Sequence, residues 1–365
     1  MEQEKTKKLR NYVIVEGYLR ENNLKYEITK TGKKYITGDV IVSVSQFNAV
    51  RVRVRAFETI GQQNELNDKY KSLSDLLTGN AISIASYLQT LPDGTEYDIE
   101  NLDKALWEGA AKNASKVWLS GSIEEYLTIS VDDKGNEKET SSFSLTANNG
   151  GFKKESAKRP FNPRATVELD GRILNIRDEQ KRDENNELVD TGRKLIDYLY
   201  VDYKGVGHKF KLIAPNAYVN PQNKELGTIV DFIESNYEKD QTAKFNLAVN
   251  TIVKRKESKN KVTGWGQVSE PVVVTEFVRE LIIIGGRTEG GISEGEPDYI
   301  SNETALSAQT LRLTQGKENG QRAAQKRNSP KSAPAKGFGA QTSAPSIPAA
   351  PVADPFMGDD GFPDF

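Results

Sequence analysis

The chain of 365 residues contains no cysteine and a single histidine, His208. Without thiols it can form no disulfide and offers no thiolate ligand to a metal ion, which fits a reducing compartment. With one imidazole it also lacks the usual partners of acid–base, nucleophilic and zinc chemistry. We therefore expect a protein that is not an enzyme and needs no cofactor, with no catalytic residue and no metal site.

Long apolar runs are also missing. No stretch approaches the roughly 18 residues that mark a membrane span, and the sequence opens on polar residues rather than a secretory leader. These absences predict no membrane partner and a cytoplasmic location.

Positive charge is not in excess, because 50 Lys and Arg are balanced by 52 Asp and Glu, for a formal net charge of −2. Any nucleic-acid site must therefore be a local basic surface.

The sequence does have β-strand patterning, and it occurs twice in the same order. From Asn11 to Phe57 β-branched and aromatic residues recur with period two, which predicts three strands. A helix within Asp98–Asn113 and strands near 117–123 and 142–145 follow. The same order then returns, with strands at 166–173, 195–201 and 208–213, a helix near 226–235, and strands at 245–253 and 272–284.

Five strands with a helix between the third and fourth is the order of an OB-fold barrel. We predict an all-β chain with minor helices, built from two tandem five-stranded OB-fold barrels. The first barrel, with a helical insertion, takes residues 1–150, a basic linker takes 151–164, and the second barrel takes 165–300. Gly17 and Gly171 lie inside the two opening strands, where a closed barrel needs a bulge or sharp bend.

Residues 301–365 are rich in Ser, Gln, Ala, Gly and Pro, and we predict a disordered tail there. Between Arg312 and Lys336 it has seven basic residues and one acidic, whereas Val352–Phe365 has four acidic residues and no basic one. Carboxylates beside exposed rings favour docking into an apolar pocket with a basic rim on partner proteins. A merely solubilising terminus is the alternative, although such tails are normally poor in aromatic residues.

The last residues, Gly358–Phe365, resemble the acidic tip of the bacterial and phage single-stranded DNA-binding protein (SSB) family, in which Asp residues lead into a terminal Pro-Phe. Val13–Arg20 and Val117–Ile123 also look like the opening strand and the post-helix strand of an SSB barrel. Three features depart from that pattern and favour a divergent phage-type member. They are the Asp between the last Pro and Phe, the long segment Glu58–Lys116 and the second barrel.

The resemblance implies a protein that coats and protects single-stranded DNA in replication, recombination or repair, inside the bacterial host cell if a phage encodes it. It also implies that replication and repair proteins bind the C-terminal tip, and it leaves an oligomer open. The residues of this expected partner site are Asp359, Asp360, Phe362, Pro363, Asp364 and Phe365.

Binding without sequence preference needs cations for phosphates and rings for bases. In the first barrel Arg51, Arg53 and Arg55 alternate with valines, so all three leave one face of a strand. Such a row is either a solvated face or an anion-binding one, and we favour the second because three like charges repel unless an anion lies across them. The other candidates here are Lys33, Lys34, Tyr35, Phe47 and Phe57, the rings being either core residues or stacking platforms.

The second barrel and the linker add further candidates. Tyr198 and Tyr200 share a strand face, and four polar residues follow them; the group is either a DNA face or a hairpin with charged edges. These four are Lys204, His208, Lys209 and Lys211. A basic hairpin contributes Lys254, Arg255, Lys256 and Trp265. The linker residues Lys153, Lys154 and Arg159 either track DNA or form a solvated hinge.

Two other interpretations stay open. An RNA-binding OB-fold protein would use the same stacking and phosphate contacts. A β-rich phage structural or assembly protein would use its barrels for protein contacts and would show no salt-sensitive oligonucleotide binding.

Overall fold

The computed structural model of the chain describes residues 9–59, 68–91, 99, 102–132, 135–183, 186–219, 224–258, 272–296 and 298–328. For residues 226, 252–258, 272–277 and 326–328 this description covers the backbone alone. Both barrels belong to one compact unit, Met1–Ala324. No helix within the described ranges is long and apolar enough to cross a membrane.

The first barrel is a closed ring of five strands: β1 (Asn11–Asn22), β3 (Lys34–Ser45), β4 (Asn48–Phe57), β5 (Lys116–Val131) and β6 (Glu137–Phe152). Around the ring β1 pairs with β3, β3 with β4, β4 with β6, β6 with β5, and β5 with β1. The β4–β6 pair is parallel and the others are antiparallel. A short strand, β2 (Lys25–Ile28), extends the edge beside β3.

The second barrel repeats this ring with β7 (Arg164–Arg182), β8 (Leu188–Val201), β9 (Gly207–Ala214), β10 (Thr242–Ser258) and β11 (Val272–Gly286). Here β9 and β11 form the one parallel pair, and β10 closes the ring on β7. The prediction of an all-β chain with two five-stranded OB-fold barrels is therefore confirmed.

Helices follow the third strand of each ring. Helix α1 (Asp68–Thr78) contributes Tyr70, Leu73 and Leu76 to the barrel core. In the second barrel the short 3-10 helix η3 (Lys224–Leu226) precedes α4 (Ile229–Asn236), whose Ile233 is buried in the core. Helices α2 (Ile84–Gln89) and α3 (Lys104–Asn113) form a separate apolar cluster beside the first barrel. The helical insertion is therefore larger than the one helix predicted from sequence.

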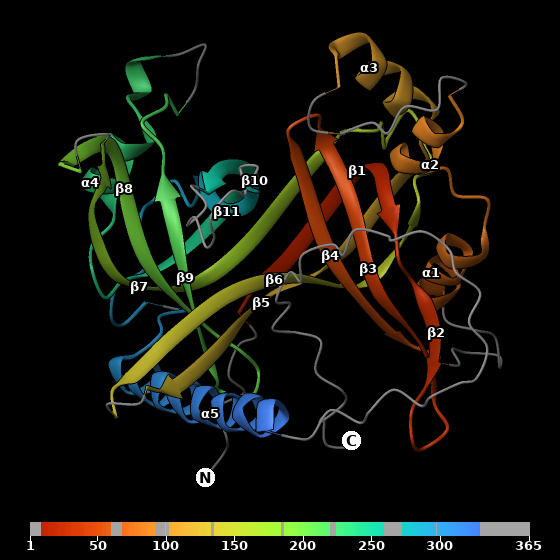
Figure 1. Ribbon diagram of the computed structural model, residues 1–365. Coiled ribbons are helices and arrows are strands. Elements are labelled where there is room, and N and C mark those ends of the chain that lie inside the picture. The colour runs from red at the N-terminus through yellow and green to blue at the C-terminus, as the bar shows by residue number, and fades with distance from the viewer. Residues whose placement is uncertain are drawn as a thin grey trace, which may run out of the picture. The chain divides into compact units, whose positions relative to one another are not determined.

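One sheet of eleven strands runs through both barrels, because β1 and β7 pair with each other (Figure 1). Val13 of β1 lies between Gly121 of β5 and Val167 of β7, so the first half of β1 pairs with its own barrel on one side and with the second barrel on the other. The segment between the barrels is held as well: the Lys153 amide donates to the Lys116 carbonyl, and the Asn162 amide donates to Glu16. These contacts hold the two ends of the segment, whereas residues 154–160 between them are exposed.

The two glycines expected to mark bulges act instead by allowing close approach. A Cβ on Gly17 would lie 2.5 Å from the Ser43 carbonyl oxygen of β3, and one on Gly171 would lie 2.5 Å from the Leu199 carbonyl oxygen of β8. The irregularities in register come slightly later, between Leu19 and Glu21 and between Ile173 and Asn175. A missing side chain therefore lets the first strand of each barrel cross the second closely.

The prediction of disorder from residue 301 is wrong for the stretch that forms α5 (Asn302–Asn328). Its buried positions, Ala305, Ala308, Arg312, Gly316 and Gly320, recur at helical spacing and face the barrels. Figure 1 shows α5 beside the far end of the β5–β6 hairpin. The remainder of the predicted tail, with the acidic tip, lies outside the described residues.

Candidate nucleic-acid interface

Three arginines occupy the outer face of β4, as their period-two spacing predicted. Val50, Val52 and Val54 are buried in the barrel, so the intervening residues Arg51, Arg53 and Arg55 point outward, and each is partly exposed. In register, these arginines lie opposite Ile41, Asp39 and Thr37 of β3, respectively. We call the outward residues of β3 and β4 the arginine face. The second and third strands of an OB barrel are the ones whose outer surface meets oligonucleotides.

Acidic and aromatic neighbours hold two of these arginines. The Arg51 guanidinium lies 2.5 Å from an oxygen of Asp39, which fixes it along β3. The Arg55 guanidinium lies 5.8 Å from the centre of the Tyr35 ring and 5.5 Å from that of Phe57. At such distances a cation is attracted to the ring faces. Cations and rings therefore form one continuous patch.

Tyr35 and Phe57 are a stacked pair at the end of that patch, with ring centres 5.3 Å apart and planes 30° apart. Tyr35 is buried and its hydroxyl donates to Glu27, whereas Phe57 is 40% exposed. Hydrogen bonds from Lys25 and then Tyr35 lower the pKa of Glu27, so this carboxylate anchors the Tyr35 ring. The Phe57 ring is therefore accessible for stacking on a base, and the buried Tyr35 ring packs against it.

A shallow hollow of about 290 Å³ opens beside Arg55 and Phe57. Ala56, Thr59, Lys69, Tyr70 and Asn148 complete its lining. Lys69 belongs to α1, and Asn148 to β6, which runs parallel to β4. The sequence alone did not single out Lys69 or Asn148, because only the fold brings α1 and β6 to β4.

The other first-barrel candidates lie at the two ends of β3 and β4. Lys33 and Lys34 are exposed at the start of β3, where the Glu58 amide donates to the Lys34 carbonyl. Phe47 is 69% exposed in the β3–β4 turn, at the opposite end of the two strands from Phe57. Beside it the Asn48 amide group donates to the Val249 carbonyl and accepts from the Thr251 amide, which fastens this turn to β10. Phe47 is therefore placed by the contact between the two barrels.

The linker candidates are divided by burial. Lys153 forms an ion pair of 2.6 Å with Glu16, and both side chains are largely buried, so its charge is already neutralised within the fold. Lys154 and Arg159 are exposed, and Arg159 closes a small turn with Ser156. The expectation that Lys153 contacts DNA is not supported, because moving a buried paired charge to a phosphate would leave Glu16 buried without its partner.

In the second barrel the expectation that Tyr198 stacks on bases is wrong. Its ring is fully buried in the barrel core, with its hydroxyl donating to the Leu169 and Ala243 carbonyls. Burial raises the pKa of this hydroxyl well above its ordinary value. Tyr200 is also buried, and its ring lies 5.9 Å from that of His208. Period two correctly placed both tyrosines on one face, but that face points into the barrel.

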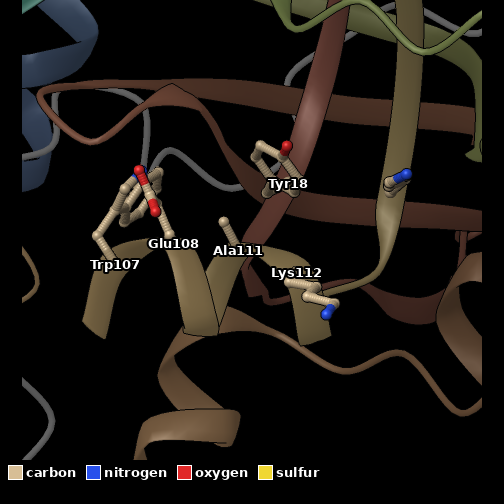
Figure 2. A pocket seen from close by; sticks show the side chains of 6 residues that line it. Tyr18, Trp107, Glu108, Ala111 and Lys112 are labelled. Atoms are coloured by element: carbon tan, nitrogen blue, oxygen red, sulfur yellow. The ribbon is translucent and has the colours of Figure 1, made fainter. Parts of the chain in front are cut away.

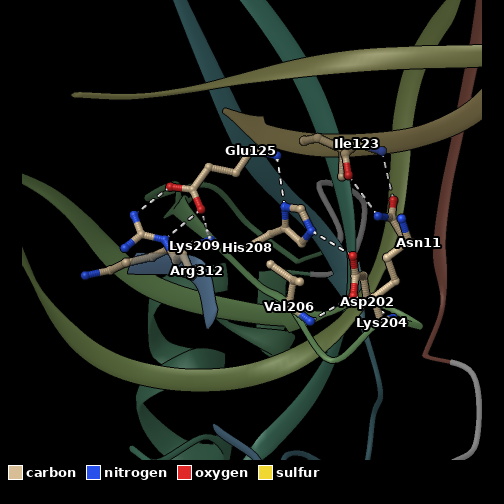
Figure 3. A network of polar contacts seen from close by, with 9 residues as sticks. All are labelled: Asn11, Ile123, Glu125, Asp202, Lys204, Val206, His208, Lys209 and Arg312. Carbon is tan, nitrogen blue, oxygen red and sulfur yellow. Dashed lines mark hydrogen bonds and ion pairs between the residues drawn. The ribbon is translucent and has the colours of Figure 1, made fainter. Parts of the chain in front are cut away.

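His208 is part of a polar network between the barrels, shown in Figure 3. Its Nδ1 accepts from the Glu125 amide at 3.4 Å, and its Nε2 lies 3.5 Å from Asp202. Burial acts to raise the pKa of Asp202, but hydrogen bonds from His208 and the amides of Val206 and Lys204 bring it below its usual value. His208 is therefore a structural residue that lies between the two barrels, and its side chain is largely buried.

The same network holds a buried ion pair. Arg312 of α5 donates to both carboxylate oxygens of Glu125, at 2.7 and 2.8 Å, and the Lys209 amide donates to one of them at 2.7 Å. Burial acts to raise the pKa of Glu125, but the bonds from Arg312, Ser141 and Lys209 outweigh it and lower this pKa. Glu125 thus ties β5, β9 and α5 together.

Three lysines of the second barrel are exposed where they were expected. Lys204 lies in the β8–β9 turn, 5.5 Å from the centre of the Tyr203 ring, and Lys209 and Lys211 point outward from β9. Lys254, Arg255 and Lys256 lie on β10, but their side chains are outside the described residues, as is the whole of Trp265. The tip residues, Asp359 to Phe365, are outside them too.

A second hollow, of about 280 Å³, lies between α3, β1 and β5 (Figure 2). Tyr18, Trp107 and Ala111 form its apolar wall, with Glu108, Lys112 and Lys116 at its rim. None of the residues predicted for nucleic acid lines it. Among the residues that the structure describes, no group of three or more His, Cys, Asp or Glu side chains is arranged to hold a metal ion.

Solved structures similar to the chain include the wild-type single-stranded DNA binding protein from Thermus aquaticus. It has 11% sequence identity and a TM-score of 0.33, and the match covers 81% of this chain and 99% of that one. A variant of that protein with a deletion and an arginine-to-alanine substitution matches at 10% identity and a TM-score of 0.33, covering 80% and 98%. No curated protein matches the chain. A family model described as YorF matches residues 92–306, more than half of the sequence, and the chain therefore belongs to the YorF family.

Proposed function

We propose that the protein binds single-stranded DNA on the arginine face of the first barrel and protects the strand during replication, recombination or repair. The observation that carries the proposal is that Arg51, Arg53, Arg55 and the partly exposed ring of Phe57 share one face of β4. Cations of this kind pair with successive phosphates, and a ring stacks on a base of any identity.

The arrangement favours an unpaired strand over a duplex. A phosphate-tracking row that ends at an exposed ring and a shallow hollow needs a base free to leave its stack, which a single strand offers at little cost. The hollow beside Arg55 and Phe57 adds Lys69 and Asn148 as a cation and an amide for the same nucleotide. The formal charge of −2 is compatible with this function, because the positive charge is concentrated locally.

The test is fluorescence anisotropy of a labelled poly-dT oligonucleotide over a series of salt concentrations. We expect binding that weakens with salt, and a log–log slope that is shallower by roughly 0.7 for each arginine removed from the arginine face. The variant is the triple change Arg51→Ala, Arg53→Ala and Arg55→Ala. A matched variant replaces three exposed lysines elsewhere, Lys104, Lys181 and Lys239, by alanine and should keep the slope.

Equal slopes for the two triple variants would refute the assignment of the arginine face, and binding that ignores salt would refute the proposed function. An unlabelled RNA oligonucleotide of matched length, added as competitor, distinguishes DNA from RNA. If RNA competes better than DNA, the chain is an RNA-binding protein that uses the same face.

The C-terminal tip completes the proposal as a docking segment for replication or repair proteins. Support comes from the sequence of Gly358–Phe365, where carboxylates flank two phenylalanines. Carboxylates steer such a peptide toward a basic rim, and a ring fills an apolar pocket.

A further inference from the structure

We propose that helix α5 covers one end of the face of the second barrel that corresponds to the arginine face of the first, and that the uncovered remainder does not bind nucleic acid, so that nucleic acid binds one barrel of each molecule. This inference rests on the proposed function and specifies which of two equivalent surfaces serves it. The second barrel is then a scaffold, with its corresponding face partly covered by the chain itself.

The two faces correspond strand by strand. β8 and β9 are the second and third strands of their ring, as β3 and β4 are of theirs. Ile196, Tyr198 and Tyr200 point into the barrel core, so Asp197, Leu199 and Val201 point outward from β8. Asp197 lies opposite Lys211 of β9, just as Asp39 lies opposite Arg53 of β4.

α5 covers the end of that face nearest the β8–β9 turn. Leu199 and Val201 are buried, yet they belong to a cluster separate from the barrel core, made with Ile300, Ala305 and Ala308. Gly207, opposite Val201, admits the helix: a Cβ there would lie 2.9 Å from the Ala308 carbonyl oxygen. Small residues on both sides thus bring the helix backbone onto the strand.

Polar contacts fix the helix along its length. At its start the buried Arg172 donates to the Tyr299 hydroxyl at 3.1 Å and also binds the Ile300 carbonyl and Asn302. In the middle Arg312 pairs with Glu125, and further on Asn319 donates to the Leu127 carbonyl at 2.9 Å. Because Arg172 and Glu125 are buried, displacing α5 would leave these two charges without the partners that the helix supplies, which is costly.

What is left of the second face is poorly suited to a single strand. The outward residues of β8 and β9 from 195 to 201 and from 207 to 213 include no aromatic side chain. Lys209 and Lys211 are exposed there, but Lys209 lies opposite the covered Leu199, and Lys211 lies opposite Asp197, which pairs with Arg177. Two lysines without a neighbouring aromatic ring do not form a groove in which bases can stack.

The test compares two matched double variants of the full chain, each removing two outward cations two residues apart on the third strand of a barrel. Arg53→Ala with Arg55→Ala changes the first barrel, and Lys209→Ala with Lys211→Ala changes the second. We expect the arginine pair to make the log–log salt slope for dT oligonucleotide binding shallower by roughly 1.4, and the lysine pair to leave it unchanged. Amide hydrogen exchange of residues 305–320 should be the same with and without oligonucleotide.

An equal loss from the lysine pair, or faster exchange in α5 when oligonucleotide binds, would overturn this inference while the proposed function stands. Binding that neither pair affects, or no salt-sensitive binding at all, would refute the proposed function and this inference with it. The two failures are therefore distinguishable in one set of titrations.

Discussion

Glu125 is the residue on which the contact between β5, β9 and α5 depends. Its side chain is almost wholly buried, and the guanidinium of Arg312 is its charged partner in the ion pair with α5. Removing one partner of a buried pair leaves an uncompensated charge, which typically costs about 3–5 kcal/mol. We therefore expect Arg312→Ala to lower the free energy of unfolding by about that amount, measured by denaturant titration.

Lys317 provides the control for this prediction. It lies five residues further along the same helix and pairs at 2.7 Å with Glu137, but both side chains are more than half exposed. Exposed pairs contribute about 0–1 kcal/mol, so Lys317→Ala should change stability little. Similar losses from the two variants would contradict the importance of the buried pair.

Glu125 also predicts how stability depends on pH. Its pKa in the folded protein lies below the ordinary value of 4.5, because bonds from Arg312, Ser141 and Lys209 outweigh burial. The stabilisation is fully present above pH 4.5 and is lost as the pH falls through the folded pKa. The stability gap between the wild type and Glu125→Gln, followed by unfolding from about pH 6 to about pH 3, should narrow with acidification. A constant gap would show that the charge of Glu125 is irrelevant.

At the residue scale the sequence predicted the arginines and the rings of Tyr35 and Phe57 beside them, but it missed Lys69 and Asn148. A period of two places Arg51, Arg53 and Arg55 on one face whatever the rest of the fold does. It places Tyr198 and Tyr200 on one face equally well, but it cannot tell the inside of a barrel from the outside when both sides are apolar. Lys69 was missed because its proximity to β4 depends on how α1 packs.

Among the elements, α5 depends on glycines. A Cβ on Gly320 would clash with the Ile129 carbonyl oxygen of β5, so Gly320→Ala must push the helix away from the hairpin. We expect this change to destabilise the chain and to speed amide exchange in α5, although alanine has the higher helix propensity. Mass-spectrometric hydrogen exchange together with thermal unfolding measures both effects.

Gly109 of α3 is the matched control, because a Cβ there meets no atom within 4 Å. Replacing a helical glycine in open space by alanine typically stabilises by about 0.5–1 kcal/mol. Gly109→Ala should therefore raise the unfolding temperature. If Gly320→Ala also raised it, the close contact between α5 and β5 would be disproved.

α5 was not predicted because its small residues are buried and its large apolar residues are exposed, the reverse of a typical amphipathic helix. Ala308, Gly316 and Gly320 face the barrels, whereas Leu306 and Leu313 are exposed. A search for large apolar residues at helical spacing therefore finds no buried face. The strands were predictable because their inward positions carry valine, isoleucine and leucine, which period two detects directly.

For the whole molecule, the position of α5 decides how the tail should be tested. A chain shortened at Ser301 would lose the helix, so the suitable truncation ends at Asn328. We expect this shortened chain to bind oligo-dT at least as tightly as the full chain, because the removed acidic residues repel phosphate and compete for the arginine face. Anisotropy at low and high salt checks this, and markedly weaker binding would instead place a principal DNA contact beyond Asn328.

The order of elements predicted both barrels, because three strands, a helix and two strands occur twice. It did not predict that β1 and β7 join them into one sheet. Periodicity identifies the face that a strand buries but not the strand that lies beside it. The join is set by backbone pairing over Asn11–Glu16 and Arg164–Leu169, in which side-chain type has little part.

The pairing of β1 has a consequence for how the protein is made. Its first half is hydrogen-bonded on one edge to β5 and on the other to β7, whose residues follow more than a hundred positions later in the chain. In a nascent chain the backbone N–H and C=O groups of this half of β1 therefore stay unpaired until the ribosome has made β5 and β7. Such distant pairing makes folding slow, and until it forms the unpaired edges of β1 can associate with other chains.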